Sequence, residues 1–266
     1  MTVNNVASSQ LNTSMIRLST GQRINSAADD AAGLGIAERM NAQVRSLDQA
    51  TNNVRDMQNL VNTAEGGLSS INDSLQRMRE LTLQAANGVL TDSDRQNIQT
   101  EIDQLTSQID STSANTEFNG MRLLDGSFSA EDGRGLNTAA DANGRGPTVN
   151  IGNMSSGMIL GAGQFDVVNN DQANLQDNLQ RIDNAMAVVT GERAYLGAMS
   201  NRFDTTIAQN QITNLNTAAA RSRIADADMA LESMRMRQAT VLEQAQMLAE
   251  QRRQREEGVQ VASLIG

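Results

Sequence analysis

The feature that most constrains this chain is a row of apolar residues whose spacing alternates between three and four positions. We call this row the coiled-coil seam; it comprises Leu47, Ala50, Val54, Met57, Val61, Ala64, Leu68, Ile71, Leu75 and Met78. A heptad pattern sustained over this length predicts a helix that packs against other helices along one whole side. Gly66 and Gly67 lie inside the seam, and each costs about 1 kcal/mol of helix propensity. The seam continues past them in register, so we expect tertiary packing to hold the helix there.

The sequence predicts that this helix runs from Arg45 to Asn87. At 1.5 Å per residue it is roughly 65 Å long, which is more than a compact domain of this size encloses, so we expect a rod. Asn87 and Gly88 are expected to end the helix, because the residue after a helix terminus often needs a positive φ.

A second helix is predicted directly afterwards, with Thr91 as its N-cap. Asp92 and Asp94 follow in the first turn, where carboxylates meet unpaired N–H groups. Apolar residues then recur with helical spacing, at Ile98, Ile102, Leu105 and Ile109. The two aspartates also suggest a calcium loop, but Asn97 and Asp103 stand where that loop has glycine and glutamate, so helix capping is the preferred interpretation.

The composition changes in the middle of the chain. In "FNGMRLLDGSF" an apolar run from Met121 to Leu124 lies between Asn-Gly and Asp-Gly turn signals, which predicts a β-strand or hairpin. Residues 127–163 are rich in Gly, Asn, Ala and Ser, with a strand predicted from Thr148 to Ile151. We expect this region to be loop-rich and weakly packed.

Helical spacing returns in the last third of the chain, at Leu175, Leu179, Ile182, Met186, Val189, Leu196 and Phe203. Polar residues then occupy apolar positions at Arg193, Asn210 and Asn214, and the register slips near Ile207 and Ala208, which predicts a kink or a change of packing partner. A Met-rich amphipathic helix is predicted over about residues 226–253, and the beginning of the chain is also expected to be helical. The predicted fold is mainly α: an elongated antiparallel helical bundle or coiled coil of N- and C-terminal segments, with a small β-hairpin region between them.

The composition excludes most catalytic chemistry. The 266 residues include no His, Cys or Lys, so the commonest general base, the thiolate nucleophile, the usual zinc ligands and Schiff-base chemistry are absent. Aromatic residues make up only 2% of the chain, which leaves few of the large side chains that line binding pockets. We therefore expect a protein that is not an enzyme, with no catalytic residue, cofactor or metal.

Charge and hydropathy limit the partners. A formal charge of −10 argues against nucleic acid or an anionic membrane, because both select basic surfaces. No stretch approaches the roughly 20 apolar residues of a membrane span, and the N-terminal residues lack the basic and apolar regions of a secretory signal peptide. The segment "EQRRQREE" alternates Arg with Glu, which favours ion pairs on a solvated helix over a polyanion-binding patch.

The segment "RLSTGQRINSAADDAAGLGIAERM" contains two adjacent carboxylates, Asp29 and Asp30. Adjacent residues on a helix point about 100° apart, so these side chains cannot converge on one substrate atom as a general acid–base pair does. We therefore interpret the segment as scaffold.

Several motifs of this chain resemble bacterial flagellin. They are "LNTSMIRLSTGQRINSAADDAAGLGIAERM", "LQRMRELTLQAANG", "TEFNGMRLLDGS", "ERAYLGAMSNRFDTTI" and "AAARSRIADADMALE", in the order found in that family. The resemblance covers about residues 11–128 and 151–249. It implies inner-core helices at residues 1–30 and 227–266, an outer shaft from residues 31–125 and 171–226, and a short variable β or loop region at residues 126–170.

The resemblance also implies roles for particular residues. In the connecting stretch, Arg23, Asn25, Asp29 and Asp30 are expected to hydrogen-bond within and between subunits. Gln76, Arg77, Leu81 and Glu101 match the pattern contacted by the animal Toll-like flagellin receptor. The competing interpretation of these four residues is a solvated helix surface.

The implied function is a structural subunit that polymerises into the flagellar filament for motility and is secreted to the cell exterior. The implied partners are copies of itself, the flagellar export apparatus, a chaperone, the filament cap, hook-associated proteins and the Toll-like receptor. Independently of the resemblance, amphipathic end helices are marginal alone and are expected to fold on association. The alternatives are a hook–filament junction protein and a secreted coiled-coil effector or adhesin. Three features depart from the family: an N-terminus shorter by roughly a dozen residues, about 18 Å of helix, a charged C-terminal tail and the absence of Lys.

Overall fold

The computed structural model describes residues 2–129, 133–161, 165–168 and 172–265. It divides into two compact units: unit 1 comprises residues 1–45 and 213–266, and unit 2 comprises residues 46–212. The described residues form helices α1 to α6 and strands β1 to β4. The predicted mainly helical fold with a small β region is confirmed.

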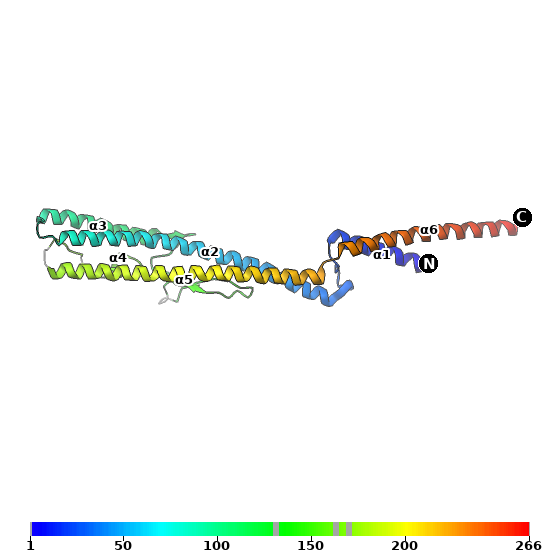
Figure 1. Ribbon diagram of the computed structural model, residues 1–266, viewed down its shortest axis with the longest axis horizontal. Coiled ribbons are helices and arrows are strands. Elements are labelled where there is room, and N and C mark those ends of the chain that lie inside the picture. Colours follow the sequence, from blue (N-terminus) through cyan, green and yellow to red (C-terminus); the bar gives the residue numbers. More distant parts are fainter. Residues whose placement is uncertain (1, 130–132, 162–164, 169–171, 266) are drawn as a thin grey trace. The chain divides into compact units, whose positions relative to one another are not determined.

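Unit 2 is built on three helical segments that lie side by side (Figure 1). They belong to α2 (Ala27–Ala85), α3 (Asp92–Asn115) and α5 (Gln172–Ala225). The coiled-coil seam of α2 faces the interior of this unit, with nine of its ten residues buried and Met57 partly buried. Opposite it, α5 contributes Ile182, Val189 and Phe203, none of which is exposed. Apolar burial along the whole seam is therefore the main stabilisation of unit 2.

Polar contacts join α2 to α5 beside this core. Arg193 Nε donates to Glu65 Oε1 at 2.8 Å, and Arg79 Nε donates to Asp183 Oδ1 at 2.8 Å. Arg193 is one of the polar residues that interrupt the apolar spacing of α5, and its partner on α2 explains why it is tolerated there. These pairs are partly solvated, so each contributes at most about 1 kcal/mol.

Helix α2 begins earlier than the sequence predicts and ends within two residues of the predicted position, at Ala85. The predicted cause of its ending is wrong, because neither Asn87 nor Gly88 has a positive φ. Instead the buried guanidinium of Arg95 caps the helix: Arg95 Nε donates to the carbonyl of Ala85 at 3.3 Å, and Nη2 donates to that of Asn87 at 3.4 Å. A cationic donor at a helix C-terminus satisfies carbonyls that lack intrahelical partners.

The N-terminus of α3 has the predicted cap. Thr91 Oγ1 accepts from the backbone N–H of Asp94, and the Asp94 carboxylate accepts from the backbone N–H of Thr91, which together form a capping box. The apolar stripe of α3 packs into the core through Ile98, Ile102 and Ile109.

The predicted hairpin follows α3. Strands β1 (Glu117–Phe118) and β2 (Met121–Arg122) pair in antiparallel fashion, with Asn119 and Gly120 between them at φ 52° and 76°. Two central residues with positive φ make a type I′ turn, the geometry that Asn-Gly favours.

The region after the hairpin is loop-rich, but the prediction that it is weakly packed is wrong. Strands β3 (Leu136–Asn137) and β4 (Thr148–Val149) pair, and the short helix α4 (Ser156–Ile159) follows. Apolar side chains of this region enter the core of unit 2, and the buried ones include Ala140, Val149, Ile151, Met154, Ile159 and Leu160. The few apolar residues of this Gly-rich segment therefore hold it against the core of unit 2.

The sequence predicts either a kink or a change of packing partner near residues 207 and 208, and helix α5 is continuous there, which is against the kink. The polar residues nearby have partners instead. Asn210 is 6% exposed, and its Nδ2 donates to the carbonyl of Ala140 at 2.8 Å. A buried amide that fixes a loop carbonyl explains a polar residue in an apolar position.

The two glycines inside the seam have different environments. A Cβ at Gly67 would lie 2.6 Å from Thr116 Oγ1 and 2.8 Å from Leu124 Cδ1. A Cβ at Gly66 would meet nothing within 4 Å. Gly67 therefore allows the hairpin region to approach α2 closely. At position 66, by contrast, no neighbouring atom requires a glycine.

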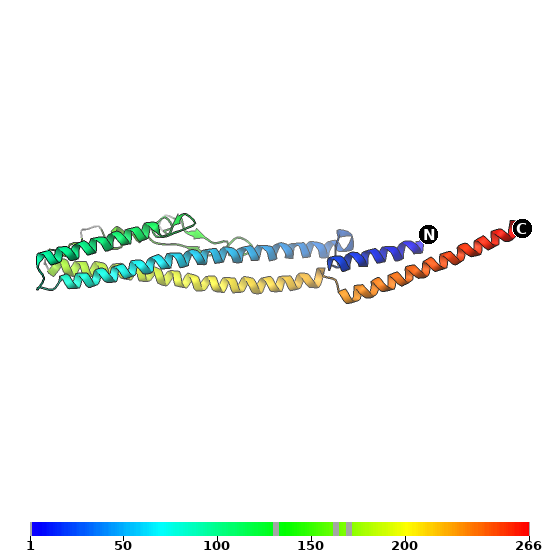
Figure 2. The ribbon, with the colours of Figure 1, turned by 90° about the horizontal axis from the view of Figure 1, so that it is seen from above.

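Unit 1 contains α1 (Thr2–Thr20), α6 (Met229–Ile265), and the ends of α2 and α5 that lie in residues 27–45 and 213–225. Helices α1 and α6 pack side by side, and α6 continues beyond the N-terminal end of α1 (Figure 2). Among the residues that the structure describes, no helix combines the length and the hydropathy needed to cross a bilayer.

Candidate functional site

A short backbone clamp joins the segment after α1 to the segment before α6. Gly21, at φ 70°, ends α1 and donates its N–H to the carbonyl of Arg17 at 2.9 Å. Gln22 and Asp226 then form an antiparallel bridge, flanked by hydrogen bonds from Arg23 N to Ala225 O at 2.7 Å and from Ala227 N to Gly21 O at 2.9 Å. Residues 21–23 and 225–227 are called the connector clamp below.

Two of the predicted connector residues support this clamp. Arg23 Nη2 donates to the carbonyl of Ile224 at 2.6 Å, and Asn25 Nδ2 donates to the carbonyl of Gln22 at 2.9 Å. Ile24, between them, is only 2% exposed. The two polar side chains therefore fix the backbone on both sides of one buried apolar anchor.

The adjacent carboxylates of Asp29 and Asp30 accept different hydrogen bonds. Asp29 Oδ2 accepts from the backbone N–H groups of Asn25 and Ser26, at 3.1 and 2.9 Å, and from Ser26 Oγ at 3.1 Å. Asp30 has φ −166° and ψ 96°, which interrupts α2, and its Oδ1 accepts from Gly33 N at 2.8 Å. Asp30 is thus the N-cap of the long part of α2, and Asp29 closes the turn before it. The premise that both aspartates are helical is therefore wrong for Asp30, but the two carboxylates accept hydrogen bonds from different backbone groups.

The environment of Asp29 favours its charged form. Its pKa is held below the usual range, first by the Asn25 N–H and then by the Ser26 hydroxyl and N–H, with a smaller effect of Arg17. Arg17 Nη2 lies 3.8 Å from Asp29 Oδ1. This guanidinium connects the turn to the second polar cluster of unit 1.

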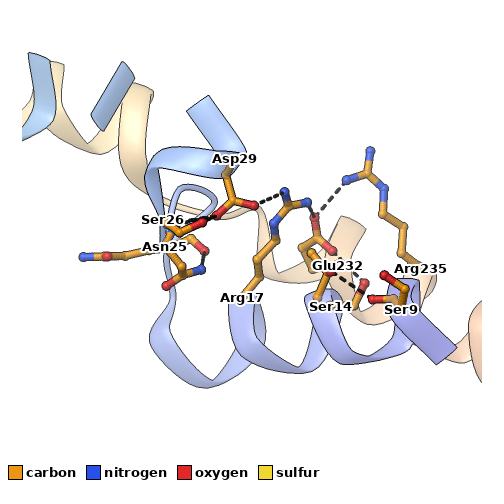
Figure 3. A network of polar contacts seen from close by, with 10 residues as sticks. Ser9, Ser14, Arg17, Asn25, Ser26, Asp29, Glu232 and Arg235 are labelled. Atoms are coloured by element: carbon orange, nitrogen blue, oxygen red, sulfur yellow. Dashed lines mark hydrogen bonds and ion pairs between the residues drawn. The ribbon is translucent and has the colours of Figure 1, made fainter. Parts of the chain in front are cut away.

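That cluster surrounds the carboxylate of Glu232 on α6, which we call the Glu232 cluster (Figure 3). Arg17 Nη1 donates to Glu232 Oε1 at 3.2 Å, and Arg235 Nη1 donates to the same oxygen at 2.8 Å. Ser14 Oγ donates to Glu232 Oε2 at 3.1 Å. Since Ser14 and Arg17 belong to α1, one carboxylate joins both helices.

Glu232 is 3% exposed, yet its surroundings keep it charged. Burial by itself would raise its pKa, but the hydrogen bonds from Arg235, Ser14 and Arg17 outweigh burial and hold the pKa below the usual range of a glutamate. The cluster is therefore charged at neutral pH.

The rest of the α1–α6 pair has an unusual distribution of side chains. In the described parts of these helices the buried residues are Ser14, Glu232 and Ala239, which are small or polar. Nine large apolar residues are exposed instead, namely Met15, Ile16, Met229, Leu231, Met234, Val241, Leu242, Met247 and Leu248, whereas Leu11, Leu18 and Met236 are partly buried. Exposure of so many large apolar side chains on a pair of terminal helices is typical of an interaction surface. We call these nine exposed residues the apolar face of unit 1.

Comparison with known proteins accounts for both ends of the chain. Residues 1–129 match the bacterial flagellin N-terminal helical region, and residues 179–256 match the bacterial flagellin C-terminal helical region. The chain is 38% identical to a flagellin of Bacillus subtilis, over 94% of this chain and 91% of that protein. The chain belongs to the bacterial flagellin family.

Two further flagellar proteins resemble this flagellin. The flagellar filament 30.7 kDa core protein of Treponema maltophilum is 37% identical, over 81% of this chain and 79% of that protein. A solved structure of a putative flagellar hook-associated protein from Vibrio parahaemolyticus aligns with a TM-score of 0.61 at 23% identity, covering 74% of this chain and all of that one. At that identity the likeness concerns the fold alone.

The four residues matched to the receptor pattern lie on α2 and α3 of unit 2. Arg77 Nη2 donates to Glu101 Oε1 at 2.8 Å, and Arg77 also pairs with Glu80. These interactions raise the pKa of the Arg77 guanidinium, the hydrogen bond to Glu101 most strongly. Gln76 is exposed, but Leu81 is only 1% exposed. A protein docking on this flagellin therefore reaches Gln76, Arg77 and Glu101, but not the side chain of Leu81 in this packing.

The Glu232 cluster was not among the predicted site residues. Glu232 and Arg235 are spaced i, i+3 on one helix, as are Ser14 and Arg17 on the other, and this spacing was the available signal. It did not reveal that the two helices are partners. No group of three or more acidic side chains that could hold a metal ion occurs in the described part of this flagellin.

Proposed function

We propose that copies of this chain polymerise head to tail into a flagellar filament, and that the apolar face of unit 1 is the main contact between them. The observation that carries this proposal is that α1 and α6 bury small and polar side chains while exposing large apolar ones. In a single copy this arrangement leaves apolar area in water, at about 25 cal/mol per Å². Contact with further copies removes that area from water.

The geometry of such a contact favours a fibre. A head-to-tail contact between identical subunits gives an open helical polymer when its rotation does not close a ring. We infer that residues 1–30 and 227–266 form the inner core of this polymer. Residues 31–125 and 171–226 would then supply the outer shaft, and residues 126–170 the short variable region.

The Glu232 cluster has a defined role in this proposal. It holds α1 against α6 through polar contacts, so this pairing does not require the nine residues of the apolar face. Those side chains remain available for neighbouring subunits. The role is structural and not catalytic, in keeping with the family.

The other partners are proposals that rest on the family. We infer export through the flagellar secretion apparatus with a chaperone, placement outside the cell, addition beneath a filament cap, and contact with hook-associated proteins at the filament base. Because the likeness to the hook-associated structure concerns the fold alone, it does not favour a hook–filament junction role for this chain.

Seeded polymerisation tests the proposal. Purified monomer is mixed with short fragments of preformed filament and followed by light scattering and electron microscopy. Indefinite fibres are expected. A variant with Leu231, Val241 and Leu248 changed to serine should keep the helical content of unit 2 and lose elongation. Discrete oligomers at every concentration, or normal elongation of the variant, would reject the proposal.

Receptor recognition is a separate proposal for the surface that carries Gln76, Arg77 and Glu101. Arg77→Ala is expected to lower the response of a reporter cell carrying the animal Toll-like flagellin receptor. Arg79→Ala is the matched control, because Arg79 also forms a surface ion pair, with Asp183 on α5. Equal responses of the two variants would contradict this proposal.

A further inference from the structure

We propose that four methionines of unit 1 form an oxidation-sensitive site, and that their conversion to sulfoxides slows the addition of a free subunit to the filament. The four are Met15 on α1 and Met229, Met234 and Met247 on α6, called the methionine set below. The reagents that the site would take are two-electron oxidants such as hydrogen peroxide. This inference rests on the proposed assembly through the apolar face of unit 1, to which all four residues belong.

Exposure separates these methionines from those of the core. The four side chains of the set are between 50% and 61% exposed. In unit 2, Met78, Met154 and Met199 are at most 6% exposed. Oxidation of methionine follows access of the oxidant to the sulfur, so the subunit should be oxidised on its assembly helices before its core.

The chemistry requires only the oxidant. The thioether sulfur attacks one peroxide oxygen, the O–O bond breaks, and the oxygen remains on sulfur as a sulfoxide while the other oxygen leaves as water. Sulfur is oxidised by two electrons and peroxide is reduced by the same two. Methionine sulfoxide reductases reverse the change.

The product is unsuited to an apolar contact. A sulfoxide is a polar hydrogen-bond acceptor, whereas the thioether it replaces is soft and apolar. Burying that acceptor against a neighbouring subunit without a donor carries a desolvation cost, so one sulfoxide in each contact is expected to slow elongation by about tenfold. The nine residues of the apolar face include all four members of the set, so several such groups would fall within one contact.

Met158 on α4 of unit 2 provides a matched control within the same chain. It is 63% exposed, comparable with the methionine set, but it lies outside the terminal helices. It should be oxidised as readily as the set without any effect on elongation. Leucine replaces methionine with little change of volume or helix propensity, and it cannot be oxidised to a sulfoxide.

The first measurement maps the oxidation. Full-length monomer and assembled filament are each exposed to hydrogen peroxide, quenched with free methionine and analysed by peptide mass spectrometry. In monomer, the methionine set and Met158 are expected to become sulfoxides while Met78, Met154 and Met199 stay reduced. In filament, the set should be protected at least about tenfold relative to Met158, because packing excludes the oxidant. Oxidation of the methionine set at equal rates in monomer and filament would contradict its place in the contact between subunits.

The second measurement tests the consequence. Oxidised monomer, with several sulfoxides in each contact, should elongate untreated seeds at least about tenfold more slowly than untreated monomer, and reductase treatment should restore the rate. The variant M15L/M229L/M234L/M247L should keep its rate after peroxide, whereas M158L should remain as sensitive as the parent chain. Unchanged elongation of oxidised monomer, or full sensitivity of the quadruple variant, would overturn the inference. Failure of untreated monomer to elongate seeds would instead reject the proposed function, whatever the oxidation map shows.

Discussion

Arg17 Nη1 lies 3.2 Å from Glu232 Oε1, although 215 positions separate the two residues in the chain. Arg235 and Ser14 converge on the same carboxylate. Nine large apolar side chains of α1 and α6 are exposed, and this polar cluster is a buried contact between the two helices in a single copy.

Loss of the Glu232 charge should therefore separate α1 from α6. Glu232→Gln removes a charged partner from both arginines, and a hydrogen bond to a charged group contributes about 1.5–3 kcal/mol. Amide hydrogens of α1 should exchange faster by a corresponding factor, as measured by mass spectrometry. Glu243→Gln is the control, since Glu243 accepts a 3.4 Å contact from Ser8 at an exposed position, and its substitution should change exchange little. Equal protection in the two variants would contradict the assignment.

Acid should weaken the same pairing in a defined pH range. The pKa of Glu232 is held below its usual value in the paired helices, so the separated helices take up the proton first as pH falls. The contribution of Glu232 is complete above the usual glutamate range, about 4.3, and is lost below it. Asp29, whose pKa is also lowered, should add to this acid sensitivity. Protection of the α1 amides, measured between pH 7 and pH 3 relative to the intrinsic exchange rate at each pH, should fall below that range, and less steeply in Glu232→Gln.

The two glycines of the coiled-coil seam should respond to alanine with opposite signs. Gly67→Ala places a methyl group against Thr116 and Leu124 and should destabilise unit 2 by about 1–3 kcal/mol, as overpacking does. Gly66→Ala meets open space and should stabilise it by up to about 1 kcal/mol, because alanine is the better helix former. Urea unfolding of both variants, followed by circular dichroism, measures the difference. Stabilisation by both substitutions would show that the hairpin does not approach α2 at Gly67.

Glu192 should show the opposite pH dependence to Glu232. Burial raises the pKa of Glu192, and the N–H of Gly152, which donates to its Oε1 at 3.3 Å, offsets this only in part. The folded chain therefore binds the proton more readily than the unfolded chain, so unit 2 gains stability as pH falls through the range just above the usual glutamate pKa.

Glu192→Gln should accordingly raise the melting temperature at pH 7 and have little effect near pH 4. Thermal unfolding at a series of pH values measures this difference. The exposed Glu117→Gln serves as the control and should stay within about 0.5 kcal/mol of the parent chain. A Glu192→Gln variant that is less stable at pH 7 would show that the Gly152 contact outweighs burial.

Features governed by neighbouring residues could be predicted from the sequence. The capping box of Thr91 and Asp94 and the type I′ turn at Asn119 and Gly120 both follow from local chemistry. Burial of the coiled-coil seam could be predicted from its spacing alone, because a heptad row of apolar residues lies on one side of a helix. The resemblance added the order of the segments and the connecting stretch.

The features that the sequence did not reveal depend on contacts between distant residues. The end of α2 is capped by Arg95, which lies on the next helix, so Gly88 does not need a positive φ. Ile151 and Met154 are too few to form a periodic pattern, yet they anchor the Gly-rich region because α2, α3 and α5 already present an apolar surface. The burial of the polar Asn210 depends on its hydrogen bond to the carbonyl of Ala140, which lies 70 positions away in the chain. For the same reason the Glu232 cluster could not be assigned before α1 and α6 were known to be partners.

The connector clamp also determines when unit 1 can close. Its two strands, residues 21–23 and 225–227, are separated by about 200 residues of chain, and closing so large a loop is slow compared with forming a helix. A subunit delivered one end at a time must therefore hold its first helix open until nearly the whole polypeptide has emerged. Under the export and assembly proposed above, folding of the ends would be linked to arrival at the filament tip, because the clamp cannot close before residues 225–227 have emerged.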